Sequence, residues 1–99
     1  MDFNKYQEEA FDKALPQCKT VDYMLIGLGN EAGETLGKYK KVLRGDYKLE
    51  DIREKLIDEC GDTLWYISGL LKILDCTLEE AAQRNINKLN DRKERGVFF

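Results

Sequence analysis

Two pairs of acidic residues in this chain share the same spacing. Glu31 and Glu34 are three residues apart, and so are Glu59 and Asp62. Residues three apart lie on one face of a helix, so each pair would present two carboxylates side by side. Both pairs lie within apolar stretches, where the like charges repel each other unless a cation lies between them. Hard divalent ions such as Mg²⁺ or Mn²⁺ prefer several oxygen ligands, so the pattern indicates a metal site.

The alternative is that these acids are solvated and form salt bridges, as single E-x-x-E motifs usually do. The neighbouring bases are Lys38, Arg53 and Lys55. A carboxylate-bridged di-iron bundle is another competitor, but its E-x-x-H motifs require histidine, and the sequence contains none. Any catalysis therefore depends on carboxylates, lysines or a hard metal. Residue types and spacing alone leave metal binding and salt bridging both open.

Four helices are expected to position these acids, because hydrophobic residues recur at helical spacings and no period-two pattern persists. The expected helices run from about Asn4 to Ala14, from Thr20 or Asp22 to Leu43, from about Leu49 to Leu74, and from a cap at Thr77 toward Arg92, ending before Gly96. We predict an all-α fold with one domain over residues 1–99, in which the helices form an antiparallel four-helix bundle.

Glycines and apolar residues indicate close contacts between helices. Gly29, Gly33 and Gly37 recur every four residues, and each costs about 1 kcal/mol relative to alanine inside a helix. Such a stripe would let another backbone approach, and Gly33 and Gly61 lie between the paired acids, where they would bring the two helices together. The second half of the third helix is apolar nearly all round, which three short helices can hardly cover. We therefore expect oligomerisation, as a homodimer or homotetramer, to complete the bundle.

Composition limits the classes of function. A net charge of −3 provides no general basic surface, so nucleic acid is not an expected partner. Cys18, Cys60 and Cys76 form no C-x-x-C motif and cannot all pair within one chain, which favours reduced thiols in the cytoplasm. The N-terminus is polar, and no apolar run approaches the roughly 18 residues that a membrane span requires. We expect a cytoplasmic protein that does not enter a membrane.

The two acid pairs, separated by the 24 residues 35–58, resemble the E-x-x-E…E-x-x-D signature of MazG-like nucleoside triphosphate pyrophosphohydrolases. Residues 27–34 are similar to the opening segment of that family, residues 62–66 to the hydrophobic continuation of its second motif, and residues 85–92 to its N-x-x-K-L-x-x-R segment. The resemblance implies a MazG-like helical fold. It also implies Mg²⁺-dependent cleavage, with Mn²⁺ as a substitute, between the α and β phosphates of a nucleoside triphosphate to give a monophosphate and pyrophosphate.

The resemblance also implies roles for individual residues. The metal-binding acids would be Glu31, Glu34, Glu59 and Asp62, and the phosphate-binding residues Asn85, Lys88 and Arg92. Bound metal would hold the phosphates, activate a water and offset charge on the pyrophosphate. Glu34 is expected to orient or deprotonate that water, and loss of Glu59 to abolish hydrolysis. Lys38 and Lys41 continue the acid face by two turns and are further candidates for phosphate contacts.

Two other functions remain open. One is a related pyrophosphohydrolase that acts on dUTP, dCTP or phosphoribosyl-ATP. The other is a non-catalytic helical module whose acidic faces dock a basic partner, and metal dependence would separate it from an enzyme. For the enzyme, the expected biological role is nucleotide-pool control or housecleaning.

Overall fold

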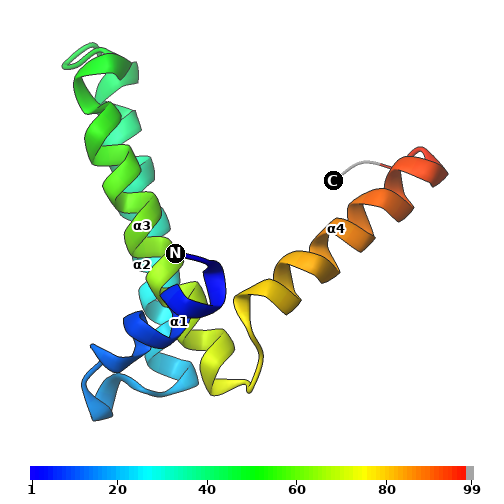
Figure 1. Cartoon of the computed structure of the whole chain (residues 1–99). Coiled ribbons are helices and arrows are strands. Elements are labelled where there is room, and N and C mark those ends of the chain that lie inside the picture. Colours follow the sequence, from blue (N-terminus) through cyan, green and yellow to red (C-terminus); the bar gives the residue numbers. More distant parts are fainter. Residues whose placement is uncertain (98–99) are drawn as a thin grey trace.

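The computed structural model describes residues 1–97, so residues 98 and 99 of the expected domain lie outside the described range. Within residues 1–97 the chain forms four α-helices, one short 3-10 helix and no strand, which confirms the all-α class (Figure 1). The elements are α1 (Phe3–Asp12), η1 (Pro16–Cys18), α2 (Val21–Leu43), α3 (Leu49–Ile73) and α4 (Leu78–Arg95). The observed bounds lie within a few residues of the predicted ones.

Local capping explains why the helices begin and end where they do. The hydroxyl oxygens of Thr20 and Thr77 accept hydrogen bonds from the backbone N–H three residues later, at 3.1 and 3.0 Å, and so begin α2 and α4. Just beyond the same helices, Gly45 (φ 93°) and Gly96 (φ 69°) take the left-handed conformation, which glycine adopts without steric cost. These signals are local, which is why the sequence predicts them.

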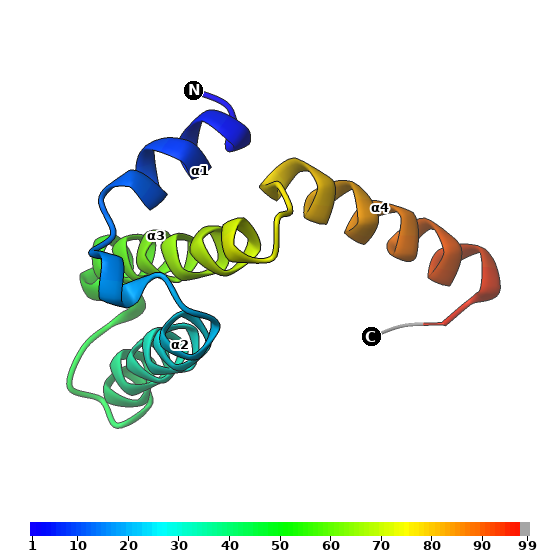
Figure 2. The ribbon, with the colours of Figure 1, turned by 90° about the horizontal axis from the view of Figure 1, so that it is seen from below.

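The two long helices α2 and α3 form an antiparallel pair, and α3 lies between α2 and α1 (Figures 1 and 2). Two glycines allow the close packing. A Cβ added to Gly27 would lie 2.0 Å from the ring of Tyr66, and one added to Gly69 would lie 2.7 Å from the sulfur of Met24. Met24 is fully buried. The ring of Tyr66 and the thioether of Met24 therefore occupy the space that a side chain at position 27 or 69 would need.

The predicted role of the glycine stripe is wrong within this chain. Four glycines have no close neighbour of this kind: Gly29, Gly33, Gly37 and Gly61. A Cβ built on any of them would meet no atom within 4 Å in the described structure, apart from its chain neighbours and the nearby backbone of its own helix. Consecutive residues on a helix point about 100° apart, so when the acids on either side point toward the neighbouring helix, the glycine between them points elsewhere. Gly33 and Gly61 thus do not bring α2 and α3 together.

The fourth helix packs against α1 and projects away from the α2–α3 pair (Figures 1 and 2). Its starting direction is fixed by Gln7 of α1, which is 2% exposed. The Gln7 amide nitrogen donates to the carbonyl oxygens of Ser68 and Cys76 at 3.1 and 3.0 Å, and its oxygen accepts from the Leu78 N–H at 3.1 Å. One buried amide therefore ties the end of α3 to the start of α4.

None of the helices in residues 1–97 has the length and apolar character needed to cross a membrane.

Candidate metal centre

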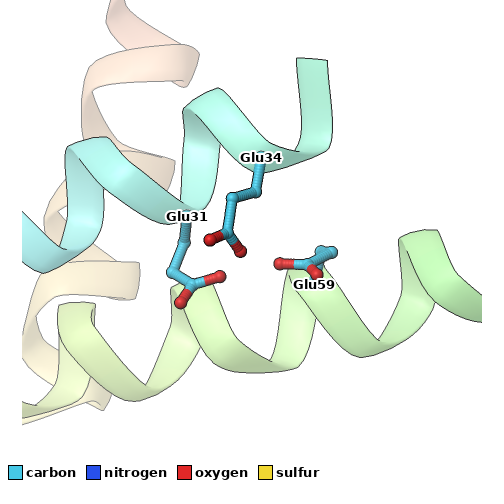
Figure 3. A group of neighbouring side chains, drawn as sticks. All are labelled: Glu31, Glu34 and Glu59. Atoms are coloured by element: carbon cyan, nitrogen blue, oxygen red, sulfur yellow. The ribbon is translucent and has the colours of Figure 1, made fainter. Parts of the chain in front are cut away.

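Three glutamates converge between the two long helices. Glu31 and Glu34 extend from adjacent turns of α2, and Glu59 extends toward them from α3 (Figure 3). Each offers a carboxylate oxygen, and the three oxygens lie within 4.8 Å of one another. Three ionised carboxylates this close repel one another strongly in a partly buried setting. We call these three residues the acid cluster.

The helices that carry the cluster also fix the nearest hydroxyl groups. Thr35 donates to the carbonyl oxygen of Glu31 at 3.0 Å, and Thr63 donates to that of Glu59 at 2.8 Å. Both bonds run back one turn within the same helix, which is a common arrangement for threonine inside helices. The hydroxyl hydrogens are therefore used by the backbone, and the three oxygens that meet in the cluster belong to carboxylates.

Burial differs across the acid cluster. Glu59 is 9% exposed, Glu31 is half-buried and Glu34 is exposed. The Oε2 atoms of Glu31 and Glu59 are buried. When both carboxyl groups are ionised, neither of these oxygens has a hydrogen-bond donor among residues 1–97. A buried polar atom without a partner is costly, and a bound cation would supply one. The donor set of oxygens alone fits Mg²⁺ or Mn²⁺.

One basic residue reaches the cluster. The Lys38 ammonium donates to Oε1 of Glu59 at 2.9 Å, and the two side chains are 29% and 12% exposed. This bond lowers the pKa of Glu59 and raises the pKa of Lys38. The salt-bridge alternative is thus correct for Lys38, whereas Arg53 pairs with its neighbour Glu54 at 2.6 Å. The bridge uses one oxygen of the cluster and leaves the others to a different cation.

A proton can also occupy the cluster. A hydrogen bond to Glu59 raises the pKa of Glu31 to about 7, and burial and the charges of Glu34, Glu59 and Asp62 act in the same direction. The proton would join the two carboxylates that otherwise lack partners. Near neutral pH, a proton would therefore compete with any metal ion for the same oxygens.

Asp62 lies at the edge of this arrangement. It is exposed, and it is not among the residues whose oxygens meet within 4.8 Å. It follows Glu59 by one turn of α3, and its side chain is shorter by one methylene. Its charge nevertheless contributes to the raised pKa of Glu31, and after burial it is the next cause of the raised pKa of Tyr6. Asp62 therefore faces the region between the cluster and α1 without joining the three glutamates.

The predicted phosphate-binding residues are divided between two places. Lys38 contacts Glu59 of the acid cluster, and Lys41 is exposed in the last turns of α2. Asn85 and Lys88 are exposed on α4, and Arg92 is half-buried there. Because α4 projects away from α2 and α3, the single chain does not bring these three residues to the acids (Figures 1 and 2).

Gln7 was not identified from the sequence, although its hydrogen bonds set the direction in which α4 leaves α3. A signal for it exists in the pattern of α1. Gln7 lies four residues after Phe3 and three before Ala10, on the face where apolar residues are expected. A polar residue at such a position is usually buried with its hydrogen bonds satisfied, as Gln7 is here.

Comparison with known proteins bears directly on this site. The family model of the MazG nucleotide pyrophosphohydrolase domain matches residues 19–97, a range that holds α2, α3 and α4 with all the acids named above. The gene 37 protein of Mycobacterium phage L5 is 39% identical over 102 aligned residues, which cover 94% of this chain and 90% of that protein. No solved structure matches significantly. By its sequence, its all-helical fold and its clustered acids, the chain belongs to the MazG nucleotide pyrophosphohydrolase domain family.

Proposed function

We propose that this protein is a divalent-metal-dependent nucleoside triphosphate pyrophosphohydrolase, which cleaves between the α and β phosphates and releases a monophosphate and pyrophosphate. The acid cluster is the observation that carries the proposal. It combines three convergent carboxylates with two buried oxygens that lack partners, in a family that generally depends on divalent metal. Without a cation, a triphosphate would be repelled from this site.

Glu31, Glu34 and Glu59 would hold the metal, and Asp62 is proposed as a further ligand at the edge of the cluster. The bound metal, Mg²⁺ or Mn²⁺, would supply charge neutralisation for the phosphates and acidify a bound water. Glu34 is the exposed member of the cluster and therefore faces the solvent from which substrate and water arrive. We assign it the role of orienting the attacking water and accepting its proton. Glu59 is the buried member, held in place by Lys38.

The proposed contacts for the phosphates remain Asn85, Lys88, Arg92, Lys38 and Lys41. The three residues on α4 would reach an acid cluster only if α4 packs differently or if a second subunit supplies the acids. This requirement agrees with the proposed homo-oligomer, a dimer or a tetramer. In this assembly, Lys88 and Arg92 would offset charge on the outer phosphates.

Exposed apolar surface supports the oligomer. A hollow of about 500 Å³ lies between α2 and α3 on the side of Leu36, Leu64 and Ile67, and its lining is mainly apolar. Leu36 is 72% exposed in the single chain. Apolar surface of this kind usually marks an interface. We place the protein in the cytoplasm, where its substrates occur and where Cys18, Cys60 and Cys76, free in this structure, would stay reduced.

The direct test is product analysis for a panel of ribonucleoside and deoxyribonucleoside triphosphates with Mg²⁺, with Mn²⁺ and with EDTA. We expect monophosphate and pyrophosphate in equal amounts, only when metal is present. Preferential hydrolysis of dUTP, dCTP or phosphoribosyl-ATP would assign the narrower substrate class. Release of inorganic phosphate, or no turnover of any substrate, would refute the proposed reaction and favour the acidic docking module.

A further inference from the structure

Lys38 links the two helices that carry the acid cluster. It follows Glu34 by one turn of α2, and its ammonium nitrogen lies 2.9 Å from Oε1 of Glu59 on α3. Within residues 1–97, it forms the ion pair that joins α2 to α3. The ammonium interacts with the charges of Glu59, Glu34 and Glu31 together. A positive charge supplied by the chain itself therefore already faces all three carboxylates.

This ammonium satisfies the cluster only in part. It pairs with one oxygen of Glu59, whereas Oε2 of Glu59 and Oε2 of Glu31 remain buried without a partner in the described structure when both groups are ionised. One positive charge also cannot balance three carboxylates. The arrangement is what a site would adopt if its native occupant carried more charge and took more ligands than an ammonium group does.

We propose that Lys38 is an exchangeable counter-ion of the acid cluster, which holds Glu59 while no metal is bound and leaves Glu59 when a divalent ion binds. Lys38 would thereby set the metal affinity of the free protein. This inference rests on the proposed function, because it takes the acid cluster as the metal site. It concerns what Lys38 does before the nucleotide arrives, and it makes Lys38 a positioning residue for Glu59.

Two physical features make the exchange feasible. A divalent ion bound to Glu59 would lie a few ångströms from the ammonium, and the two positive charges would repel each other in a site only partly open to water. The lysine stem is flexible, and 29% of the side chain is already exposed, so the ammonium can swing outward. Lys38 lies one turn of α2 beyond the exposed Glu34. If its ammonium swung outward, it would reach the side of the cluster that faces solvent, from which a triphosphate would approach.

The test compares Mn²⁺ binding to nucleotide-free wild-type protein, Lys38→Met and Lys40→Met, by titration calorimetry at pH 8. Methionine keeps most of the length of the side chain and removes the charge. We expect Lys38→Met to bind Mn²⁺ about fivefold more tightly than wild type, the upper end of the effect of a single ion pair near a surface, because the Lys38–Glu59 pair is partly buried. Lys40→Met removes the same charge from an exposed position on α2 and should bind as wild type does. Lys38→Arg keeps the charge and should stay within twofold of wild type.

Thermal denaturation gives a second readout that does not involve activity. Without metal, Lys38→Met should melt at a lower temperature than wild type, because the three acids lose their counter-ion. Saturating Mn²⁺ should raise the melting temperature of Lys38→Met by more than it raises that of wild type. The difference in melting temperature between the two proteins should therefore become smaller. If Lys38→Met does not fold without metal, Lys38→Gln serves for the same comparison, because its amide can still donate to Glu59 without a charge.

Unchanged or weaker Mn²⁺ affinity in Lys38→Met would overturn this inference. It would leave the proposed function intact, because pyrophosphate release by the wild type does not depend on the exchange. If neither protein bound Mn²⁺, the inference and the metal site would both be refuted. If both bound Mn²⁺ with the expected difference but no nucleotide were hydrolysed, only the proposed reaction would fail.

Discussion

At the scale of single residues, the properties of the site follow from which positive species balances the three glutamates. A proton on Glu31 and the ammonium of Lys38 interact with the same few oxygens that the proposed divalent ion would bind. The pKa values of Glu31 and Glu59 are displaced in opposite directions, because a hydrogen bond to Glu59 raises that of Glu31, whereas the hydrogen bond from Lys38 lowers that of Glu59. Glu59 has the lysine as its partner, whereas Glu31 has mainly other carboxylates around it.

This difference predicts how pH affects the metal-free protein. The pKa of Glu31 is about 7 in the folded chain, against 4.5 as its ordinary value. Between these two values the folded state binds more protons at Glu31 than the unfolded state does, so the contribution of Glu31 to stability should be greatest below the lower value and should be lost as pH rises through about 7. The lowered pKa of Glu59 affects stability only in more acidic solution.

The measurement is thermal denaturation in EDTA from pH 5 to pH 8. We expect the melting temperature to fall across this range and the fall to be largely abolished in Glu31→Gln. Glu50→Gln, which changes an exposed acid at the start of α3, should keep the wild-type slope. A wild-type melting temperature that rises steadily over the same range would show that Glu31 does not hold this proton.

At the scale of the helices, the sequence predicts those features that depend on local chemistry. Thr20, Thr77 and Gly96 lie at the helix ends where their types predict caps and stops. The spacing of the acids likewise predicts that Glu31 and Glu34 share a face, and both do face α3 (Figure 3). Local patterns succeed here because hydrogen bonds within one or two turns determine them.

Features that depend on the contacts between helices were not predictable in the same way. The pattern of Gly29, Gly33 and Gly37 suggests close packing, yet Gly27 and Gly69 are the glycines against which side chains fit. Their role depends on where Tyr66 and Met24 lie in the neighbouring helix, which spacing within one helix does not specify. The pairing of Lys38 with Glu59 was likewise one of several possible salt bridges until the register of α2 against α3 was known.

The junction between α3 and α4 provides a prediction at this scale. Replacement of Gln7 by alanine would leave the carbonyl oxygen of Cys76 and the N–H of Leu78 without this partner. It would also remove the second hydrogen bond of the Ser68 carbonyl oxygen, which accepts another within α3. A buried polar group that loses its hydrogen bond costs about 1–3 kcal/mol, so the variant should lose at least about 2 kcal/mol of unfolding free energy. Urea denaturation measures this, with Gln17→Ala at an exposed position as the control. Equal stability of the two variants would mean that Gln7 does not hold the junction.

At the scale of the whole molecule, the single chain looks incomplete. The fourth helix extends away from the pair that holds the acids (Figure 1). The apolar hollow on α2 and α3 is uncovered in the single chain. The predicted oligomer would account for both features, because a second subunit would cover the hollow and could also bring acids and phosphate-binding residues together. The sequence indicates that a partner is needed through the apolar residues of α3, but it does not specify the arrangement.

Light scattering on the purified protein tests this assembly. We expect a particle mass of two or four times the 11.5 kDa of the chain. Leu36→Glu should reduce the mass to that of one chain, because Leu36 lines the hollow and is 72% exposed, so a charge there harms an interface more than it harms the fold. Leu43→Glu, at a position 75% exposed and outside the hollow, should leave the mass unchanged. A wild-type protein of one-chain mass at micromolar concentration would contradict the oligomer.

Pyrophosphate release by Glu59→Gln shows whether the acid cluster performs the proposed metal-dependent hydrolysis. Glutamine keeps the size of the side chain but removes the buried charge that the metal requires. The matched control is Glu54→Gln, because Glu54 lies on the same helix and its side chain is 81% exposed. We expect Glu59→Gln to fold and to release no pyrophosphate with Mg²⁺ or Mn²⁺, and we expect Glu54→Gln to be as active as wild type. Pyrophosphate release by Glu59→Gln at the wild-type rate would contradict the proposed role of the acid cluster.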